Sequence, residues 1–164
     1  MAYVRKRKDF GMRRHGLSQK VRVGIVARDR FQGEALAADC EPFASATEIF
    51  ANLGLLREWP DLMAFGLLLI DVAQDVEGKL RFIEQMQGRS AARIMMVMPQ
   101  DDQALRLRGL GLGASGYFTD ATTEKDRRAA IADVLALNRV NQNAEDRVPP
   151  AHDRAGRLAR RLAR

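Results

Sequence analysis

The stretch GLLLID, residues 66–71, decides the fold. Residues 67–70 are apolar side chains in a row, a pattern typical of a strand that is buried on both faces of a sheet. The run ends on a carboxylate, Asp71. Ligands of open parallel sheets bind at the carboxyl ends of the strands, so Asp71 is predicted to lie at a functional edge. The simpler interpretation is that this aspartate only ends the strand.

Strands and helices alternate on both sides of this stretch. Apolar and β-branched runs predict further strands over 21–27, 41–45, 93–98 and 116–118. Apolar residues at helical spacing predict helices over 29–40, 46–59, 78–87, 101–114 and 123–140. The helix over 46–59 would begin at the cap Thr47 and would share one apolar face among Ile49, Phe50, Leu53 and Leu56. This alternation predicts an α/β domain with a five-stranded parallel sheet that is covered by helices on both faces.

The chain has 164 residues and a net charge of +6, and the excess lies at its two ends. Residues 1–22 carry +7, residues 145–164 carry +3, and residues 23–144 carry −4 by difference. Residues 1–20 show no hydrophobic period and are predicted to form a flexible basic arm. The cations of this arm that point to a binding role are Arg5, Lys6, Arg7, Lys8, Arg13 and Arg14.

The rest of the chain divides into three parts. Residues 21–140 hold the alternating elements and are predicted to form the domain. Residues 141–150 are polar and are predicted to be a linker, because no helix can cross Pro149 and Pro150. Residues 151–164 are predicted to form an Arg-rich amphipathic helix or tail, with a thin apolar stripe at Ala155, Leu158 and Leu162.

Composition argues against several classes of protein. The single cysteine, Cys40, excludes an internal disulfide and favours a reducing compartment, and no apolar run is long enough to span a bilayer. We therefore expect a cytoplasmic protein without a membrane span. No Cys/His spacing is typical of zinc, and no serine or cysteine nucleophile stands with a suggestive base. We expect no enzymatic activity, no bound metal and no cofactor.

Residues 21–140 resemble the receiver domain of response regulators. A hydrophobic strand that ends on Asp71, 48 residues after Val23, is similar to the phosphoacceptor pattern of that family. The segment GLGLGASGYFTD (109–120) resembles the family's AGAxGYLxK segment. The resemblance implies a flavodoxin-like, three-layer fold. It also implies that Asp71 holds the phosphoacceptor position and that Tyr117 holds the position of the family's switch aromatic.

The chemistry of that family needs parts that this chain replaces. Two acidic residues after the first strand hold Mg²⁺ with the acceptor, a Ser or Thr after the fourth strand binds the phosphoryl group, and a Lys after the fifth strand offsets its charge. The simplest alignment places other residues at these positions, namely Ala27 and Arg28, Met98 or Pro99, and Asp120. A shift of one residue would make Asp29 a residual metal ligand, although a helix cap is the simpler interpretation.

Two of these replacements reverse the sign of a charge. Arg28 stands where the family has an acid, and Asp120 stands where it has a cation. Arg28 is therefore predicted to pair with Asp71, with Asp120 or with both, so that an ion pair replaces the metal and the lysine and fixes the site in one state. Bringing an anionic phosphoryl donor within about 4 Å of Asp71 costs roughly 4 kcal/mol unless cations offset it.

We therefore predict an atypical, stand-alone receiver-like regulatory protein. It would act by protein–protein interaction in bacterial signal transduction or transcription control, without being phosphorylated. Its partners would be proteins, including a second copy bound through the face of the fourth helix, fifth strand and fifth helix. One alternative is a phosphorylatable response regulator, with Asp71 as acceptor and Mg²⁺ as cofactor. The other is a nucleic-acid-binding regulator that uses the basic arms.

Overall fold

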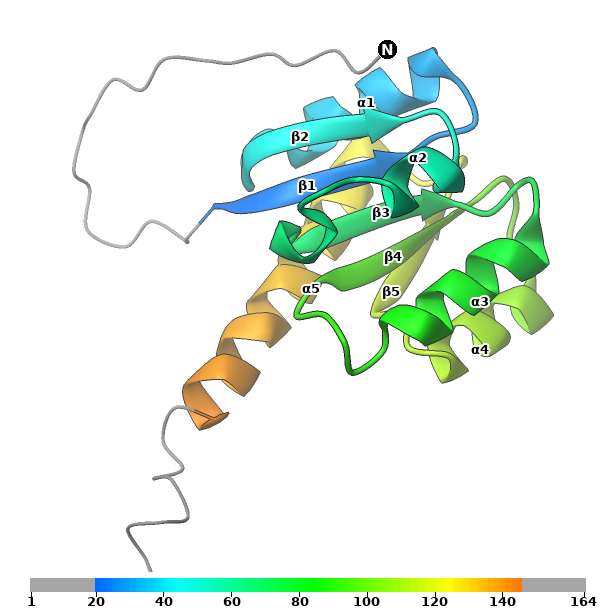
Figure 1. The fold of residues 1–164 in the computed structure, drawn as a ribbon. Coiled ribbons are helices and arrows are strands. Elements are labelled where there is room, and N and C mark those ends of the chain that lie inside the picture. Colours follow the sequence, from blue (N-terminus) through cyan, green and yellow to red (C-terminus); the bar gives the residue numbers. More distant parts are fainter. Residues whose placement is uncertain (1–19, 146–164) are drawn as a thin grey trace, which may run out of the picture.

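The strand that ends at Asp71 lies at the centre of a parallel sheet (Figure 1). In the computed structural model, which describes residues 20–145, the strands are β1 (Val21–Val26), β2 (Ala44–Phe50), β3 (Leu67–Asp71), β4 (Arg93–Met98) and β5 (Gly116–Thr119). Their order is β2-β1-β3-β4-β5, and every neighbouring pair is parallel. This is the flavodoxin-like order, so the predicted fold class is confirmed. All residues of β3 are buried, as its unbroken apolar run predicted.

Helices cover both faces of the sheet and complete the three layers. Helices α1 (Arg30–Cys40) and α5 (Glu124–Glu145) pack on one face. The other face is covered by α2 (Leu53–Arg57), the 3₁₀ helix η1 (Leu62–Ala64), α3 (Val76–Met86) and α4 (Gln103–Gly111). The chain thus forms two apolar cores, one on each side of the sheet. Within residues 20–145, no helix is long and apolar enough to cross a membrane.

The predictions for residues 41–59 are wrong in part. The second strand runs over Ala44–Phe50 rather than 41–45, and helix α2 covers only Leu53–Arg57 of the predicted helix 46–59. Ile49 and Phe50 suit one face of a helix, but in β2 they lie on opposite faces, with Phe50 buried and Ile49 exposed. The cap is Asn52, whose side chain accepts a hydrogen bond from the Leu55 N–H at 3.0 Å. Pairing along the whole of β1 outweighs the local helical pattern.

Aspartates cap three of the helices that begin at the carboxyl edge of the sheet. Asp29, Asp75 and Asp102 each accept a hydrogen bond from a backbone N–H in the first turn of α1, α3 and α4. Asp75 adopts a left-handed backbone conformation, with φ of 50°. The caps add negative charge to the same edge as Asp71, and this edge is therefore rich in carboxylates.

Helix α5 extends beyond the sheet at the opposite edge. Its residue Val134 lies against Gly116, where a Cβ would come within 3.1 Å of the valine side chain. Gly116 lies in register with Met95, Leu69 and Ile25, so Val134 packs beside the middle of the sheet and not yet at the edge where β1, β3 and β4 start. The helix continues to Glu145 (Figure 1), about 16 Å further at about 1.5 Å per residue. The first residues of the predicted linker 141–150 are therefore helical. The rest of that linker, the arm residues 1–19 and the tail 151–164 lie outside the described residues.

Candidate functional site

Asp71 is a buried carboxylate at the end of the central strand. Its exposed fraction is 0%, and both of its oxygens accept hydrogen bonds. The backbone N–H of Ala73 donates to Oδ1 at 2.8 Å, and the Gln32 amide donates to Oδ2 at 2.7 Å. A buried carboxylate is costly unless its charge is paired and hydrogen-bonded, so these partners account for only part of its stabilisation.

The charge of Asp71 is balanced by Arg28, which lies between two carboxylates. Arg28 follows β1, and its Nε lies 3.4 Å from the Asp71 Oδ2. Its Nη2 donates a hydrogen bond to Asp120, which directly follows β5. Both contacts predicted for Arg28 from the sequence are present. The hydrogen bond to Asp120 is the main cause that raises the pKa of Arg28, although partial burial opposes it.

Gln32 and Asp29 hold this arrangement in place from α1. Asp29 accepts the Gln32 backbone N–H at 2.8 Å, so its carboxylate is the cap of the helix. The Gln32 side chain accepts the Arg28 backbone N–H at 3.0 Å and donates to Asp71. One glutamine therefore connects the loop that carries the cation to the buried carboxylate. Gln32 was not predicted as a site residue, although it follows Arg28 by four residues, which is about one helical turn.

Lys79 is a second cation that the sequence did not single out. It lies in α3 with an exposed fraction of 8%. Burial lowers the pKa of Lys79, whereas the charges of Asp71 and Asp75 act in the opposite direction. The buried carboxylate thus lies in the field of one cation from the β1–α1 loop and another from α3. Lys79 stands next to Leu80 in α3, and no sequence pattern there indicates that the charge of Asp71 acts on it.

The remaining positions taken from the resemblance do not supply a phosphoryl-binding group. Ala27 is buried, Met98 is a core side chain with 0% exposure, and Pro99 is exposed. None of the three offers a hydroxyl or a carboxylate. The donor set also does not fit Mg²⁺, because a guanidinium already bridges Asp71 and Asp120. Within residues 20–145, no three His, Cys, Asp or Glu side chains are placed to hold a metal ion.

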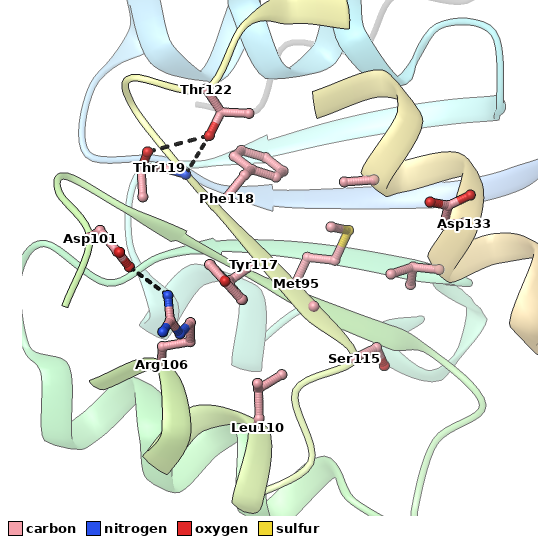
Figure 2. Close-up of a pocket in the computed structure, with 13 residues that line it drawn as sticks. Met95, Asp101, Arg106, Leu110, Ser115, Tyr117, Phe118, Thr119, Thr122 and Asp133 are labelled. Carbon is pink, nitrogen blue, oxygen red and sulfur yellow. Dashed lines mark hydrogen bonds and ion pairs between the residues drawn. The ribbon is translucent and has the colours of Figure 1, made fainter. Parts of the chain in front are cut away.

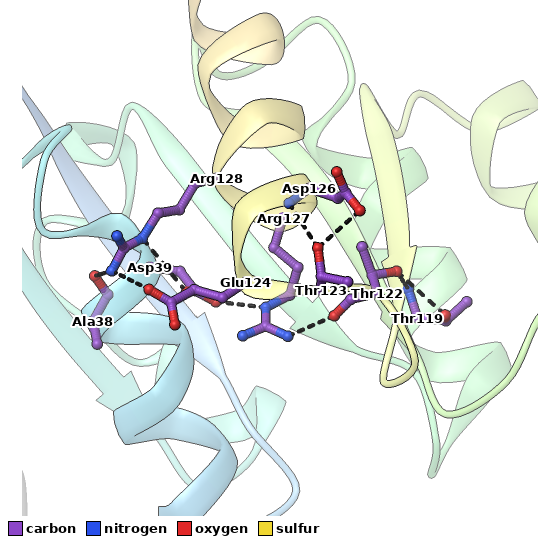
Figure 3. A network of polar contacts seen from close by, with 9 residues as sticks. All are labelled: Ala38, Asp39, Thr119, Thr122, Thr123, Glu124, Asp126, Arg127 and Arg128. Carbon is purple, nitrogen blue, oxygen red and sulfur yellow. Dashed lines mark hydrogen bonds and ion pairs between the residues drawn. The ribbon is translucent and has the colours of Figure 1, made fainter.

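A second buried carboxylate, Asp39, joins α1 to α5 (Figure 3). Its exposed fraction is 2%, and Arg127 Nε donates to it at 2.5 Å. Arg128 Nε lies 3.7 Å from the other oxygen of Asp39. Arg127 also donates to the backbone carbonyl of Thr122, in the loop that carries Asp120. This cluster braces the same loop that presents the acid to Arg28, and no sequence pattern pointed to it.

Tyr117 lies in a groove between α4 and α5, on the floor formed by β5 (Figure 2). The Arg106 guanidinium lies 5.2 Å from the centre of the Tyr117 ring, and it also donates to Asp101 at 3.0 Å. Leu110 lines the groove and has 39% of its surface exposed, while its neighbour Leu107 has 59% exposed. Apolar side chains of α4 are therefore presented to solvent beside the groove.

The strand order and the carboxylate at the end of β3 define a receiver-like fold. The chain is similar to a response regulator from Thermotoga maritima, with a TM-score of 0.60 and 16% identity, over 71% of this chain and 98% of that chain. It is similar to a response regulator receiver protein from Burkholderia phymatum, with a TM-score of 0.59 and 19% identity, over 71% and 96%. The orphan response regulator HP1043 of H. pylori gives a TM-score of 0.59 and 14% identity, over 70% and 96%.

These similarities concern the fold. No protein-family model matches the chain, and no curated protein matches its sequence. The structural likeness to receiver domains therefore rests on topology and shape.

Proposed function

We propose that this chain is a receiver-like regulatory protein whose phosphoacceptor position is fixed in one state by an internal ion pair. The observation that carries the proposal is the Arg28 guanidinium between Asp71 and Asp120. The chain would act as a binding protein in bacterial signal transduction or transcription control, not as an enzyme. Asp71 would serve as the anchor of the ion pair and would not accept a phosphoryl group.

The charges around Asp71 oppose phosphoryl transfer to it. Its two oxygens are occupied by Gln32, Ala73 and Arg28. A phosphoryl donor would have to displace the guanidinium and would then face Asp120 as well. Two unit charges of like sign about 4 Å apart repel by roughly 4 kcal/mol at an effective dielectric constant near 20. Lys79 offsets part of this repulsion, so about a thousandfold loss of rate is its upper limit.

The partner in this proposal is a second copy of the chain, bound through α4, β5 and α5. The support is the exposed pair Leu107 and Leu110 beside the groove over Tyr117. A two-fold interface would place the same apolar side chains of both copies against each other. Arg106 holds Tyr117 and Asp101 on this face, so the face would keep one shape.

The first test asks whether Asp71 is a phosphoacceptor. Wild-type protein and Asp71→Asn are incubated with Mg²⁺ and acetyl phosphate, and intact mass is measured. Thermal unfolding is followed in parallel with Mg²⁺ and beryllofluoride. We expect no gain in mass and no thermal stabilisation of either protein. A gain of one phosphoryl group in the wild type that is absent from Asp71→Asn would overturn the fixed site and support the phosphorylatable alternative.

The second test concerns the face of association. Sedimentation of the full chain is compared with Leu107→Glu and with the control Met63→Glu, since Met63 is 56% exposed but lies in η1. We expect the wild type and the control to form dimers and Leu107→Glu to sediment as a monomer. A monomeric wild type, or a Leu107→Glu variant that still dimerises, would contradict the assignment of this face.

A further inference from the structure

Besides the groove over Tyr117, a second cavity lies between α1 and the loop that follows β5, beside the ion pair of Arg28. Its volume is about 370 Å³, which is within the range of small-molecule sites. Residues of α1, β4, β5 and α5 line it, so its walls come from four elements of the fold. We propose that this cavity binds a free α-amino acid with an apolar side chain.

The apolar part of the cavity consists of a buried floor and one exposed ring. Leu36, Val97 and Phe118 form the floor, and each of them has 3% or less of its surface exposed. Phe31 lines the same cavity but is 84% exposed, more than any other large apolar side chain of residues 20–145. An apolar ligand group would contact both the floor and this ring and would be removed from water there.

Two arginines line the cavity and retain hydrogen-bond donors for a ligand. Arg28 uses Nε and Nη2 for its two carboxylates. Arg127 uses Nε for Asp39 and Nη1 for the Thr122 carbonyl, as Figure 3 shows. A guanidinium group has five N–H donors in a rigid fork. Nη1 of Arg28 and Nη2 of Arg127 are therefore available to a carboxylate that enters the cavity.

The carboxylates around these arginines select a ligand that also carries a positive charge. Asp29 and Asp120 line the cavity, and the Asp120 side chain is 41% exposed. Together with the buried Asp71 and Asp39, four carboxylates stand against two guanidinium groups, and Lys79 offsets at most one of the excess charges. A simple anion is therefore repelled. A zwitterion offers its carboxylate to the arginines and its ammonium group to the aspartates at the rim.

Such a ligand would connect α1 to the loop between β5 and α5. It would stabilise the arrangement in which Arg28 pairs with Asp120, because a bound ligand stabilises the state that binds it. The proposal thus rests on the fixed ion pair of the proposed function. It adds control by a small molecule in place of control by phosphorylation.

The experiment is isothermal titration calorimetry on the full chain, without Mg²⁺ or a phosphoryl donor. The probes are L-phenylalanine, L-leucine and L-methionine. For the probe that binds most tightly, analogues that lack the ammonium group, the carboxylate or the side chain are titrated next. For phenylalanine these analogues are 3-phenylpropionate, 2-phenylethylamine and glycine.

Four variants locate the binding on the structure. Ala35→Leu fills the cavity from an exposed position of α1. Its matched control is Ala104→Leu, the same substitution at an exposed position of α4 on the other side of the sheet. Asp29→Asn removes a charge from the rim and keeps the helix cap, because Asn caps a helix as well as Asp does. Phe31→Ala removes the exposed ring.

We expect at least one of the three amino acids to bind the wild type and Ala104→Leu equally, and its analogues to bind at least about tenfold more weakly. Ala35→Leu should abolish binding, and Asp29→Asn and Phe31→Ala should each weaken it about fivefold. The proposal is overturned if none of the three binds, if an analogue binds as tightly as its amino acid, or if Ala35→Leu binds like Ala104→Leu. If an amino acid binds in this way but Asp71 gains a phosphoryl group in the mass measurement, only the proposed function fails.

Discussion

Two aspartates within residues 20–145 are almost completely buried, and they are stabilised in different ways. Asp39 receives both of its cations, Arg127 and Arg128, from a single neighbouring helix. Asp71 is held by a glutamine of α1, a backbone N–H of its own loop and an arginine that it shares with Asp120. The first arrangement is a brace between two helices. The second gathers three loops at the edge where ligands of this fold bind.

The difference lies in what each carboxylate would lose with its arginine. The shortest contact of Asp39, at 2.5 Å, is with Arg127. Without Arg127, Asp39 would keep only the contact to Arg128 at 3.7 Å. Asp71 would keep the hydrogen bonds from Gln32 and Ala73. The cation at Asp71 therefore matters more for the charge of the site than for the fold, whereas the cation at Asp39 stabilises the packing of α1 on α5.

The largest effect is expected for Arg127→Ala. This change leaves the Asp39 carboxylate buried and poorly paired and removes the hydrogen bond to the Thr122 carbonyl. We expect the free energy of unfolding to fall by about 3 kcal/mol, as measured by urea denaturation. Arg128→Ala is the control, because its side chain is 41% exposed, and it should cost less than about 1 kcal/mol. Equal losses in the two variants would show that α5 does not hold Asp39 through Arg127.

A smaller loss is expected for Arg28→Ala. Asp71 keeps two hydrogen bonds in this variant, and the Arg28 side chain is 26% exposed in the wild type, so we expect a loss of about 2 kcal/mol. Asp71→Asn should recover part of that loss in the double variant, because it removes the unpaired charge. A double-mutant cycle in urea measures this coupling. Additive losses in the cycle would mean that Arg28 and Asp71 do not interact energetically.

The buried thiol of Cys40, next to Asp39, makes the free energy of unfolding depend on pH. Burial, and secondarily the charge of Asp39, raises the pKa of the Cys40 thiol from 9.0 to about 12. The unfolded chain loses this proton first, so the contribution of the thiol to stability is intact below pH 9 and is lost as the pH rises from 9 toward 12. At pH 10 the loss should be about 1.4 kcal/mol. Urea denaturation at pH 8 and pH 10 should show this extra loss in the wild type but not in Cys40→Ala. An identical pH dependence in both would contradict it.

The sequence predicted the sheet because its signals are local and agree with one another. Residues 67–70 and 94–98 form apolar runs typical of strands buried on both faces, and they were placed correctly. Residues 46–59 were misassigned because β2 is an edge strand, and its pairing with β1 leaves little trace in the pattern of its own residues. The hydrophobic pattern of one segment does not show the stabilisation that pairing with a neighbouring strand adds.

The site residues that lie at the ends of strands could be predicted from the sequence. Those that approach the site from inside a helix could not. Arg28, Asp71 and Asp120 each follow or end a strand, so the topology alone brings them to one edge. Gln32 contacts Asp71 from inside a helix, and Lys79 feels its charge from another helix. Nothing in the pattern of those helices distinguishes the two residues from solvent-exposed polar residues. Long-range contacts of this kind depend on how the helices pack on the sheet.

The smallest effect tests whether the cation alone separates this site from a metal site. Arg28→Asp would place a third carboxylate beside Asp71 and Asp120, and oxygen ligands of this kind suit Mg²⁺. The variant should be less stable than the wild type without metal, because like charges then face each other. Mg²⁺ at about five times its dissociation constant should return about 1 kcal/mol, seen as a rise in the thermal midpoint. The wild type and the double variant Arg28→Asp/Asp71→Asn should not respond in this way. If Mg²⁺ does not stabilise Arg28→Asp, features other than the charge of residue 28 prevent metal binding. The backbone of the β1–α1 loop would then be what distinguishes the site of Asp71 from that of Asp39.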